Sequence, residues 1–330
     1  MPRQPRLDTP GALHHVMGRG IDGIEIFGTR NDRVDFLDRL KDLYKKDAFN
    51  IYAWVLMSNH FHLLVRTGNL SLSNSMRKLL TGYGVNYNRR HKRYGHLFQN
   101  RYKSILCEDD PYLLELTRYI HLNPLRAGIV KGIKALNRYQ WCGHSVIMGS
   151  IKRDWQDGDT VLGYFGKRRK RALEKYEKFI ADGIKEGSRP DLVGGGLVRS
   201  LGGWSQVLSL RRSGGKVFSD ERILGSSEFV KDVITEVDEK AKETLRLNLK
   251  ISDLSSLSKE ICVGEGIEEN DLRSGIRKRN VVKTRRIFCQ ITIKKMGYSG
   301  ADVARFLGIN TSAANRLAVS DELLEIEKYI

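Results

Sequence analysis

Cysteine and proline are scarce in this 330-residue sequence, and it contains no long hydrophobic run. The four cysteines, Cys107, Cys142, Cys262 and Cys289, lie far apart and form no CxxC pair, which argues against a zinc knuckle and a disulfide framework. We expect reduced, mostly buried thiols. No apolar run approaches the length that spans a bilayer, and the first residues, MPRQPRLDTPGALHH, lack the apolar stretch of a signal peptide. We therefore expect a cytoplasmic protein with no membrane partner.

Acidic residues are outnumbered, with 39 Asp and Glu against 57 Lys and Arg and a formal net charge of +18. Such an excess favours a polyanionic partner, because basic side chains bind phosphates and release counterions. Charge alone leaves open the alternative of a basic protein without such a partner. The length exceeds what one hydrophobic core usually supports, so two or more domains are expected.

The spacing of apolar residues predicts an α+β fold in the first 130 residues and a mainly helical C-terminal region. A glycine-rich stretch at residues 194–203 predicts a turn or linker. Asn123-Pro124 predicts the end of a helix, because proline disfavours helical geometry in the residue before it. The predicted strands cover residues 13–20, 50–57 and 60–66, and residues 97–106 are predicted as a strand or an extended segment. The predicted helices cover residues 31–46, 74–93, 110–123, 167–184, 272–296, 299–307 and 312–319.

His60 and His62 lie on one predicted strand, in the segment IYAWVLMSNHFHLLVRT. Side chains alternate along a strand, so both imidazoles project from the same face. Two imidazoles on a rigid strand can hold a divalent metal that acts as a Lewis acid on a phosphodiester. A pair of ordinary polar residues on a solvated strand face is the alternative.

Tyr119 lies on the predicted helix of PYLLELTRYIHLNP, and Asn123 follows it by one helical turn. This spacing puts a nucleophile beside an amide oxygen that could complete a metal site. The phenol has a pKa of about 10 and is scarcely ionised at neutral pH, so metal activation of the phosphate suits it. The alternative makes Tyr119 an edge-of-core residue and Asn123 a helix terminator.

Three segments in this order, His60-Phe61-His62, GHLFQNRYKS at 95–104 and TRYIHLNPLRAG at 117–128, resemble the REP-associated tyrosine transposases. These belong to the IS200-like, single-tyrosine HUH transposase superfamily. The resemblance covers roughly residues 10–145 and implies a ferredoxin-like antiparallel sheet with packed helices. It also implies His60 and His62 as metal ligands, Tyr119 as nucleophile and Asn123 as a possible third ligand.

The C-terminal segment, DLRSGIRKRNVVKTRRIFCQITIKKMGYSGADVARFLGINTSAANRLAVS, resembles the DNA-binding domain of the bacterial replication initiator DnaA. Residues 299–316 resemble a helix-turn-helix with Gly308 at the turn. The initiator's usual Asp-His pair is replaced by Asn310-Thr311, so its sequence specificity does not carry over. A helical cap with solvated basic residues is the alternative. The expected DNA-contacting residues here are Arg277, Lys278, Arg279, Lys283, Arg285, Arg286, Asn310, Thr311, Ser312, Asn315 and Arg316.

The expected domains are an HUH nickase at 1–145, a connecting region of unassigned role at 146–249 and a helix-turn-helix domain at 250–330. Together they predict a bacterial, nucleoid-associated enzyme that cleaves and rejoins single-stranded hairpin DNA with Mg²⁺ or Mn²⁺, through a 5′-phosphotyrosine. Duplex DNA is the expected partner of the C-terminal domain, and both a monomer and a homodimer stay open. The rival readings are a replication or conjugation relaxase, a non-catalytic DNA-binding regulator and a metal-dependent hydrolase. The basic residues expected to bind the hairpin are Arg77, Lys78, Arg89, Arg90, Lys92, Arg93, Arg101 and Lys103.

Overall fold

The computed structural model describes residues 7–8, 10–187, 189, 192, 220, 222–250, 253–321 and 323–330. The chain forms two compact units, Met1–Asp232 and Val233–Ile330. The predicted glycine-rich turn or linker at 194–203 lies outside the described residues.

The first unit is built on one sheet, whose strand order is β2-β3-β1-β4-β5 in the described part of the chain. β1 pairs antiparallel with β3 and β4, β2 pairs antiparallel with β3, and β5 joins β4 in parallel. The first four strands and two helices follow the order βαββαβ, which is the ferredoxin-like topology. The strands are β1 (Leu13–Arg19), β2 (Phe49–Leu56), β3 (His60–Thr67), β4 (Lys103–Cys107) and β5 (Ile223–Leu224).

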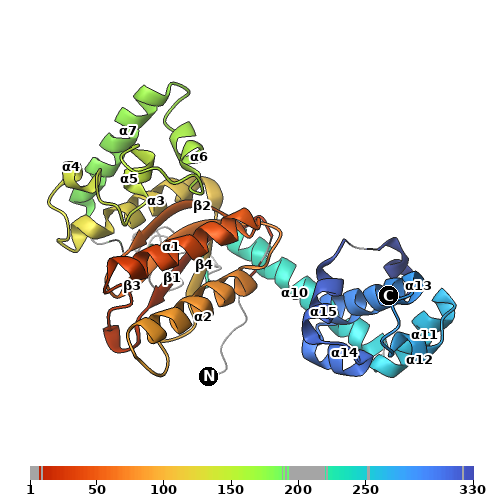
Figure 1. Ribbon diagram of the computed structural model, residues 1–330. Helices are drawn as coiled ribbons and strands as arrows, with labels where there is room; N and C mark the ends of the chain where they lie inside the picture. The colour runs from red at the N-terminus through yellow and green to blue at the C-terminus, as the bar shows by residue number, and fades with distance from the viewer. Residues whose placement is uncertain are drawn as a thin grey trace. The chain divides into compact units, whose positions relative to one another are not determined.

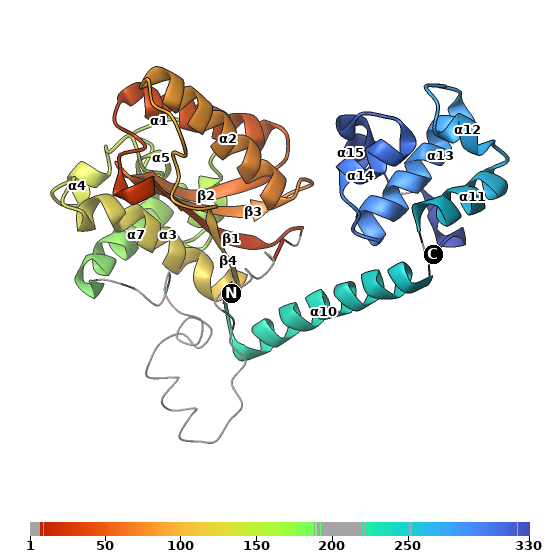
Figure 2. The ribbon, with the colours of Figure 1, turned by 90° about the horizontal axis from the view of Figure 1, so that it is seen from below.

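β2 and β3 form the predicted hairpin, closed by a hydrogen bond from Met57 N to His60 O at 2.9 Å. Phe61, Leu63 and Val65 of β3 face the core under α1 (Arg30–Lys45) and α2 (Leu72–Arg90). Leu64 belongs to the core on the opposite face, so His60 and His62 also project to that side. Figures 1 and 2 show α1 and α2 on one face of the sheet and α3 on the other.

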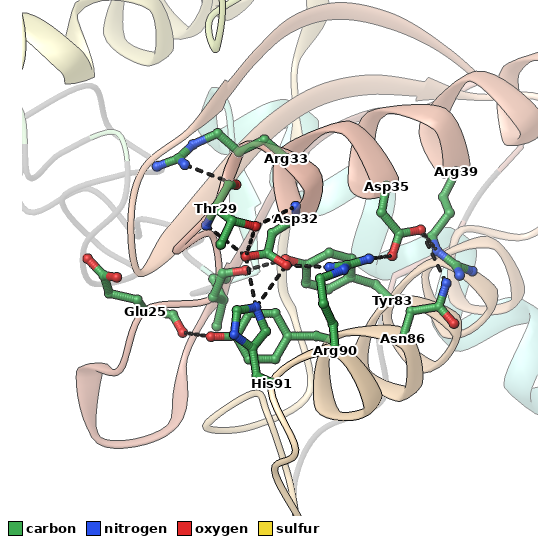
Figure 3. Close-up of polar contacts among 12 residues, drawn as sticks. Glu25, Thr29, Asp32, Arg33, Asp35, Arg39, Tyr83, Asn86, Arg90 and His91 are labelled. Carbon is green, nitrogen blue, oxygen red and sulfur yellow. Dashed lines mark hydrogen bonds and ion pairs between the residues drawn. The ribbon is translucent and has the colours of Figure 1, made fainter.

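A polar cluster centred on Asp32 joins α1 to the end of α2 (Figure 3). Asp32 closes a capping box with Thr29 at the start of α1. Its carboxylate, fully buried, also accepts hydrogen bonds from Arg90 and from His91 Nε2, the latter at 3.0 Å. Burial alone would raise the pKa of Asp32, but the hydrogen bonds from His91, Thr29 and Arg90 outweigh it and hold the pKa below its usual value.

α3 (Asp109–Arg126) covers the second face of the sheet, and Leu113, Leu116 and Ile120 pack into the core there. The prediction that Asn123-Pro124 ends this helix is wrong, because the helix continues through Pro124 to Arg126. Pro124 has no N–H to offer the carbonyl of Ile120. The Asn123 side-chain Nδ2 donates to that carbonyl at 3.3 Å, and to Tyr119 O at 2.8 Å. A side chain thus replaces the missing backbone donor, and the helix is not interrupted.

The helices after α3 belong to the first unit, so the expected domain boundary at residue 145 is not where the chain divides. Val161, Tyr176 and Ile180 are fully buried in the core that contains α3, and Tyr176 Oη lies 2.8 Å from His121 Nδ1. The apolar residues of these later helices must be buried, and they share a core with the apolar face of α3. The elements are α4 (Ile133–Leu136), α5 (His144–Ile147), α6 (Gly158–Gly163), α7 (Arg169–Asp182) and a short 3₁₀ helix, Gly183–Glu186.

The second unit is helical, with its own core around Ile287, Phe288 and Leu307. The predicted single helix over 272–296 is wrong at its start, because α12 ends at Leu272 and α13 begins at Arg279. The turn between them is held by Arg285, which donates to four backbone carbonyls. The helices are α10 (Ser227–Lys250), which begins in the first unit, α11 (Leu254–Glu265), α12 (Glu269–Leu272), α13 (Arg279–Cys289), a π-helical segment (Gln290–Lys295), α14 (Gly300–Leu307), α15 (Thr311–Val319) and a 3₁₀ helix (Leu324–Lys328).

All four cysteines are buried, and none of them forms a disulfide, as expected from their spacing. Among the described helices, none combines the length and the apolar character needed to cross a bilayer.

Candidate active site

The structure brings the histidine strand and the tyrosine helix together on one face of the sheet. The ring centroids of His62 on β3 and Tyr119 on α3 are 5.8 Å apart, with an interplanar angle of 81°. The ring centroids of His60 and His62 are 5.3 Å apart. Tyr119 is partly exposed, whereas His62 is buried. A phenol that reaches solvent therefore adjoins a pair of imidazoles.

The hydrogen bond between His60 and Asn59 fixes which nitrogen of His60 is free to bind a ligand. His60 Nδ1 lies 2.7 Å from Asn59 Oδ1, while Asn59 Nδ2 donates to Gly23 O at 3.2 Å. Because the amide oxygen only accepts, His60 Nδ1 carries the proton and donates it. The lone pair of His60 then lies on Nε2. A histidine that ligates a metal through Nε2 is commonly oriented in this way.

A third imidazole, His15 of β1, belongs to the same cluster although its role was not expected from the sequence. Its Nε2 lies 3.0 Å from His62 Nδ1, and its ring lies 6.0 Å from that of Tyr119. A proton on His62 Nδ1, donated to His15, would leave His62 Nε2 as the ligating nitrogen. The sequence signal was the His14-His15 pair in a predicted strand. The strand order that puts β1 beside β3 was not visible in it.

Burial favours the uncharged imidazoles that a metal requires. Burial lowers the pKa of His62 well below its usual value, and the neighbouring His15 and His60 lower it further. Burial, together with the positive charge of Arg19, also lowers the pKa of His60. Neutral imidazole is the metal-binding form, so His60 and His62 fit a divalent ion through nitrogen.

Within the described part of the chain, no further histidine, cysteine or carboxylate side chain completes a metal site with His60 and His62. The described residues contain no group of three or more of these side chains that fits a metal. Asn123, expected as a possible ligand, lies one turn after Tyr119 with its Nδ2 turned to the helix carbonyls. Its Oδ1 keeps acceptor capacity.

Two cavities meet beside the histidines. One, of about 430 Å³, is lined by Arg19, His60, His62 and Lys103 among others. The other, of about 830 Å³, runs between α2 and residues 95–102. Both share the wall formed by Gln99, Asn100 and Arg101. Arg19, Arg77, Arg101 and Lys103 are the lysines and arginines that line the two cavities.

The predicted hairpin-binding residues differ in their exposure and in their ion pairs. Arg77 and Arg101 are exposed and line the larger cavity. Arg90 is paired with Asp32 and Asp35, so part of its charge is neutralised within the protein. The remaining residues of this set are exposed, apart from the half-buried Arg93: Lys78, Arg89, Lys92, Arg93 and Lys103.

In the second unit, the predicted turn is a left-handed one, because Gly308 has φ 67° at the end of α14. Asn310 caps α15 by accepting a hydrogen bond from Ala313 N at 2.7 Å. Arg285, expected to contact DNA, is instead buried and holds the turn before α13, so we leave it out of the DNA surface. Lys283 is paired with Glu265 and Glu325, and Arg286 donates to Asp321 O. The exposed members of the predicted set are Arg277, Lys278, Arg279, Asn310, Thr311, Ser312, Asn315 and Arg316.

Arg126 is a further site residue that the sequence reasoning missed. Its guanidinium carbon lies 5.5 Å from the centre of the Tyr119 ring. The signal was present, since Arg126 stands in the TRYIHLNPLRAG segment, but it is seven positions after Tyr119 and beyond a proline that was expected to end the helix. The observed continuation of α3 brings the two residues together.

Residues 15–123, which contain His60, His62 and Tyr119, match the family model described as "Transposase IS200 like". This segment is therefore similar to the IS200-like transposases over about a third of the chain. The family model does not extend to the second unit, whose DnaA-like character stays a prediction.

Among solved structures, the chain is similar to one described as "Structure of the REP associates tyrosine transposase bound to a REP hairpin". The two share 13% sequence identity with a TM-score of 0.35, and the match covers 48% of this chain and 98% of that chain. No curated protein matches the chain.

Proposed function

We propose that this protein cleaves and rejoins single-stranded hairpin DNA through a covalent 5′-phosphotyrosine on Tyr119. The observation that carries the proposal is the 5.8 Å approach of the Tyr119 and His62 rings, within the segment that matches the transposase family. A nucleophile beside a phosphate-activating site is the arrangement that covalent phosphoryl transfer requires.

In the proposed reaction, Tyr119 Oη attacks the phosphorus of the scissile phosphodiester. The new bond joins that oxygen to phosphorus, the bond from phosphorus to the 3′-oxygen breaks, and the phenol proton is lost to water. The leaving 3′-oxygen takes up a proton and becomes a free 3′-hydroxyl. One ester replaces another of similar energy, so a later 3′-hydroxyl can reverse the step and join strands without ATP.

His60 and His62 would hold a divalent metal, Mg²⁺ or Mn²⁺, with Asn123 as a third ligand. When bound, the ion supplies Lewis-acid polarisation of the phosphate. Imidazole ligands suit Mn²⁺ better than Mg²⁺, which prefers oxygen. The residues around the pair orient it: Asn59 holds His60 through Nδ1, and His15 contacts Nδ1 of His62.

We propose that the hairpin reaches the site along the two joined cavities. Arg77 and Arg101 line the larger one, and Lys103 lines the one beside the histidines. Phosphate contacts from such side chains are sequence-independent and weaken with salt. Through their shared wall, the cavities would give the hairpin a path from α2 to His60 and His62.

For the second unit we propose duplex binding through α14 and α15 as a helix-turn-helix. Support comes from the left-handed Gly308 between the two helices and from the exposed polar residues Thr311, Ser312 and Arg316 of α15. Such a module would tether the catalytic unit near its target and raise the local DNA concentration. The proposed setting is the bacterial nucleoid, with a monomer or a homodimer as the working form.

A labelled hairpin oligonucleotide incubated with Mn²⁺ and the full chain, then run on a denaturing gel, tests the proposal. We expect a covalent protein–DNA adduct from the wild type and none from Tyr119→Phe. Tyr112→Phe is the matched control, because Tyr112 lies on the same helix, and it should form the adduct. Cleavage without an adduct would favour a metal-dependent hydrolase, and binding without cleavage would favour a non-catalytic regulator. A relaxase would also form the adduct, but would rejoin an origin-like strand rather than a hairpin.

A further inference from the structure

Arg126, the last residue of α3, packs its guanidinium beside Tyr119 without a full set of hydrogen bonds. The guanidinium carbon is 5.5 Å from the centre of the Tyr119 ring. Among the described residues, Arg126 Nε and Nη1 are buried and have no hydrogen-bond partner. Nη2 makes a long contact to Gly183 O at 3.4 Å. A buried donor without a hydrogen-bond partner lowers the stability of the fold by roughly 1–3 kcal/mol. Two such donors beside a nucleophile therefore indicate a role other than stabilising the fold.

The nearby carboxylates are already engaged by other arginines. Glu115 accepts from Arg118 at 2.7 Å and from Arg189 at 3.1 Å. Glu186 accepts from the same two arginines, at 2.7 and 3.0 Å. No ion pair of Arg126 exists within the part of the chain that the structure describes.

Burial lowers the pKa of Arg126, while the proximity of Tyr119 acts in the opposite direction. A guanidinium nevertheless stays charged under all ordinary conditions. A half-buried cation with two donors that have no partner among the described residues, next to the phenol, is suited to an anion that arrives with the substrate.

We propose that Arg126 is a catalytic residue that binds the non-bridging oxygens of the phosphate attacked by Tyr119. The inference rests on the proposed function. As the bond from Tyr119 Oη to phosphorus forms and the bond to the 3′-oxygen breaks, the N–H donors of Arg126 face the charge that develops on the non-bridging oxygens. Planar guanidinium matches two phosphate oxygens at once, which an ammonium group does not. The same contact then holds the phosphate of the covalent intermediate.

The test measures whether the effect of replacing Arg126 depends on the charge of the scissile phosphate. Adduct formation is measured with the full chain, Mn²⁺ and two hairpins, one natural and one with a methylphosphonate at the scissile position. On the natural hairpin, Arg126→Gln should slow adduct formation by roughly 100- to 1,000-fold, as loss of an oxyanion donor does. On the methylphosphonate, which lacks one charged oxygen, the same substitution should matter by less than about 10-fold. Equal losses on both hairpins would overturn the inference.

Controls separate this role from a structural one. Arg138→Gln removes the same charge from an exposed position and should change neither rate. Arg126→Lys keeps the charge but not the fork, and should fall between the wild type and Arg126→Gln. Added guanidinium ion should restore part of the rate of Arg126→Ala on the natural hairpin. If the wild type does not react with the methylphosphonate, the rescue by guanidinium ion is the test of the inference. A folded Arg126→Ala variant whose rate does not rise with the ion contradicts the inference.

The same gels tell failure of the inference from failure of the proposed function. A wild type that forms no adduct, or a Tyr119→Phe variant that still forms one, contradicts the proposed function itself. A wild type that depends on Tyr119 while Arg126→Gln keeps the full rate contradicts only the role of Arg126.

Discussion

The imidazole of His62 and the phenol of Tyr119 meet edge to face, at 5.8 Å between centroids and an interplanar angle of 81°. One residue lies on β3, which is hydrogen-bonded on both sides to β2 and β1, and the other on α3, the helix that covers that face of the sheet. Both elements are fixed by fully buried apolar residues, Leu64 on the strand and Ile120 on the helix. The relative position of the two side chains is therefore a property of the packed core rather than of a mobile loop.

Replacing Asn59 should weaken metal binding without touching a ligand. Asn59→Ala removes the acceptor of His60 Nδ1–H, and loss of such an orienting partner typically costs roughly 10- to 100-fold in metal affinity. Mn²⁺ titration of the full chain by calorimetry measures the effect. Asn59→Asp loses the donor to Gly23 O but keeps the acceptor of His60 Nδ1–H. Because that acceptor is kept, the variant should bind Mn²⁺ at least as well as the wild type. Unchanged affinity in Asn59→Ala would contradict the orienting role.

The two roles of Asn123 can be separated by removing Pro124 as well. In the wild-type background, Asn123→Ala should lower the free energy of unfolding by about 1 kcal/mol, because Ile120 O loses its donor. In a Pro124→Ala background the backbone N–H returns, and the stability cost should shrink. A ligand role predicts weaker Mn²⁺ binding in both backgrounds. Chemical denaturation and Mn²⁺ titration give the two readouts, and unchanged affinity in both would assign Asn123 to the helix alone.

Asp32 makes the first unit sensitive to acid. Its pKa is held below the usual 3.8 in the folded state, so the unfolded chain takes up the proton at a higher pH than the folded chain does. The stabilisation is fully present above the unfolded pKa and is lost as the pH falls through the lower, folded value. Denaturation at a series of acidic pH values should show this loss in the wild type and not in Asp32→Asn.

At neutral pH, Asp32→Asn should also be less stable than the wild type. The loss should stay below the roughly 3–5 kcal/mol of a fully buried ion pair, since Arg90 is partly exposed. Asp35→Asn removes another partner of Arg90 outside the capping box (Figure 3), and should cost less. A stability of Asp32→Asn equal to that of the wild type would contradict the role of the cluster.

Substitutions of Arg285 and Lys278 should have separate effects in the second unit, the first on folding and the second on DNA binding. Arg285→Met removes a donor from four backbone carbonyls, of which Asp271 O keeps the Ser274 hydroxyl, and should destabilise α13 by several kcal/mol at about 1–3 kcal/mol for each carbonyl left without a donor. Hydrogen exchange of the α13 amides in the full chain measures this. Lys278→Gln, at an exposed position, should leave exchange unchanged. If Lys278 contacts a phosphate, its loss should reduce the salt dependence of duplex binding by about one unit.

Local patterns in the sequence predicted the first three strands and six helices to within a few residues, namely β1, β2, β3, α1, α2, α3, α7, α14 and α15. The strand over 60–66 and the helix over 31–46 correspond to β3 and α1, because alternation and helical spacing of apolar residues are local signals. Two predicted helix bounds were wrong, and in both cases a side-chain hydrogen bond to a backbone carbonyl is the reason. Pro124 does not end α3, since the Asn123 side chain supplies the missing donor. The helix expected from Leu272 is broken, since the Arg285 guanidinium binds the carbonyls of the turn.

The sequence by itself determined the chemistry available: paired imidazoles on one strand face, a phenol and an amide one turn apart on a helix, and an excess of basic residues. Their residue types and spacing follow from the chain alone. Only the tertiary structure decided that His15 joins His62, because this needs β1 to lie beside β3 in the sheet. Likewise, only the continuation of α3 beyond Pro124 carries Arg126 to the face of Tyr119. Side chains on separate elements meet through the packing of the elements that carry them, and no local pattern in the sequence encodes that distance.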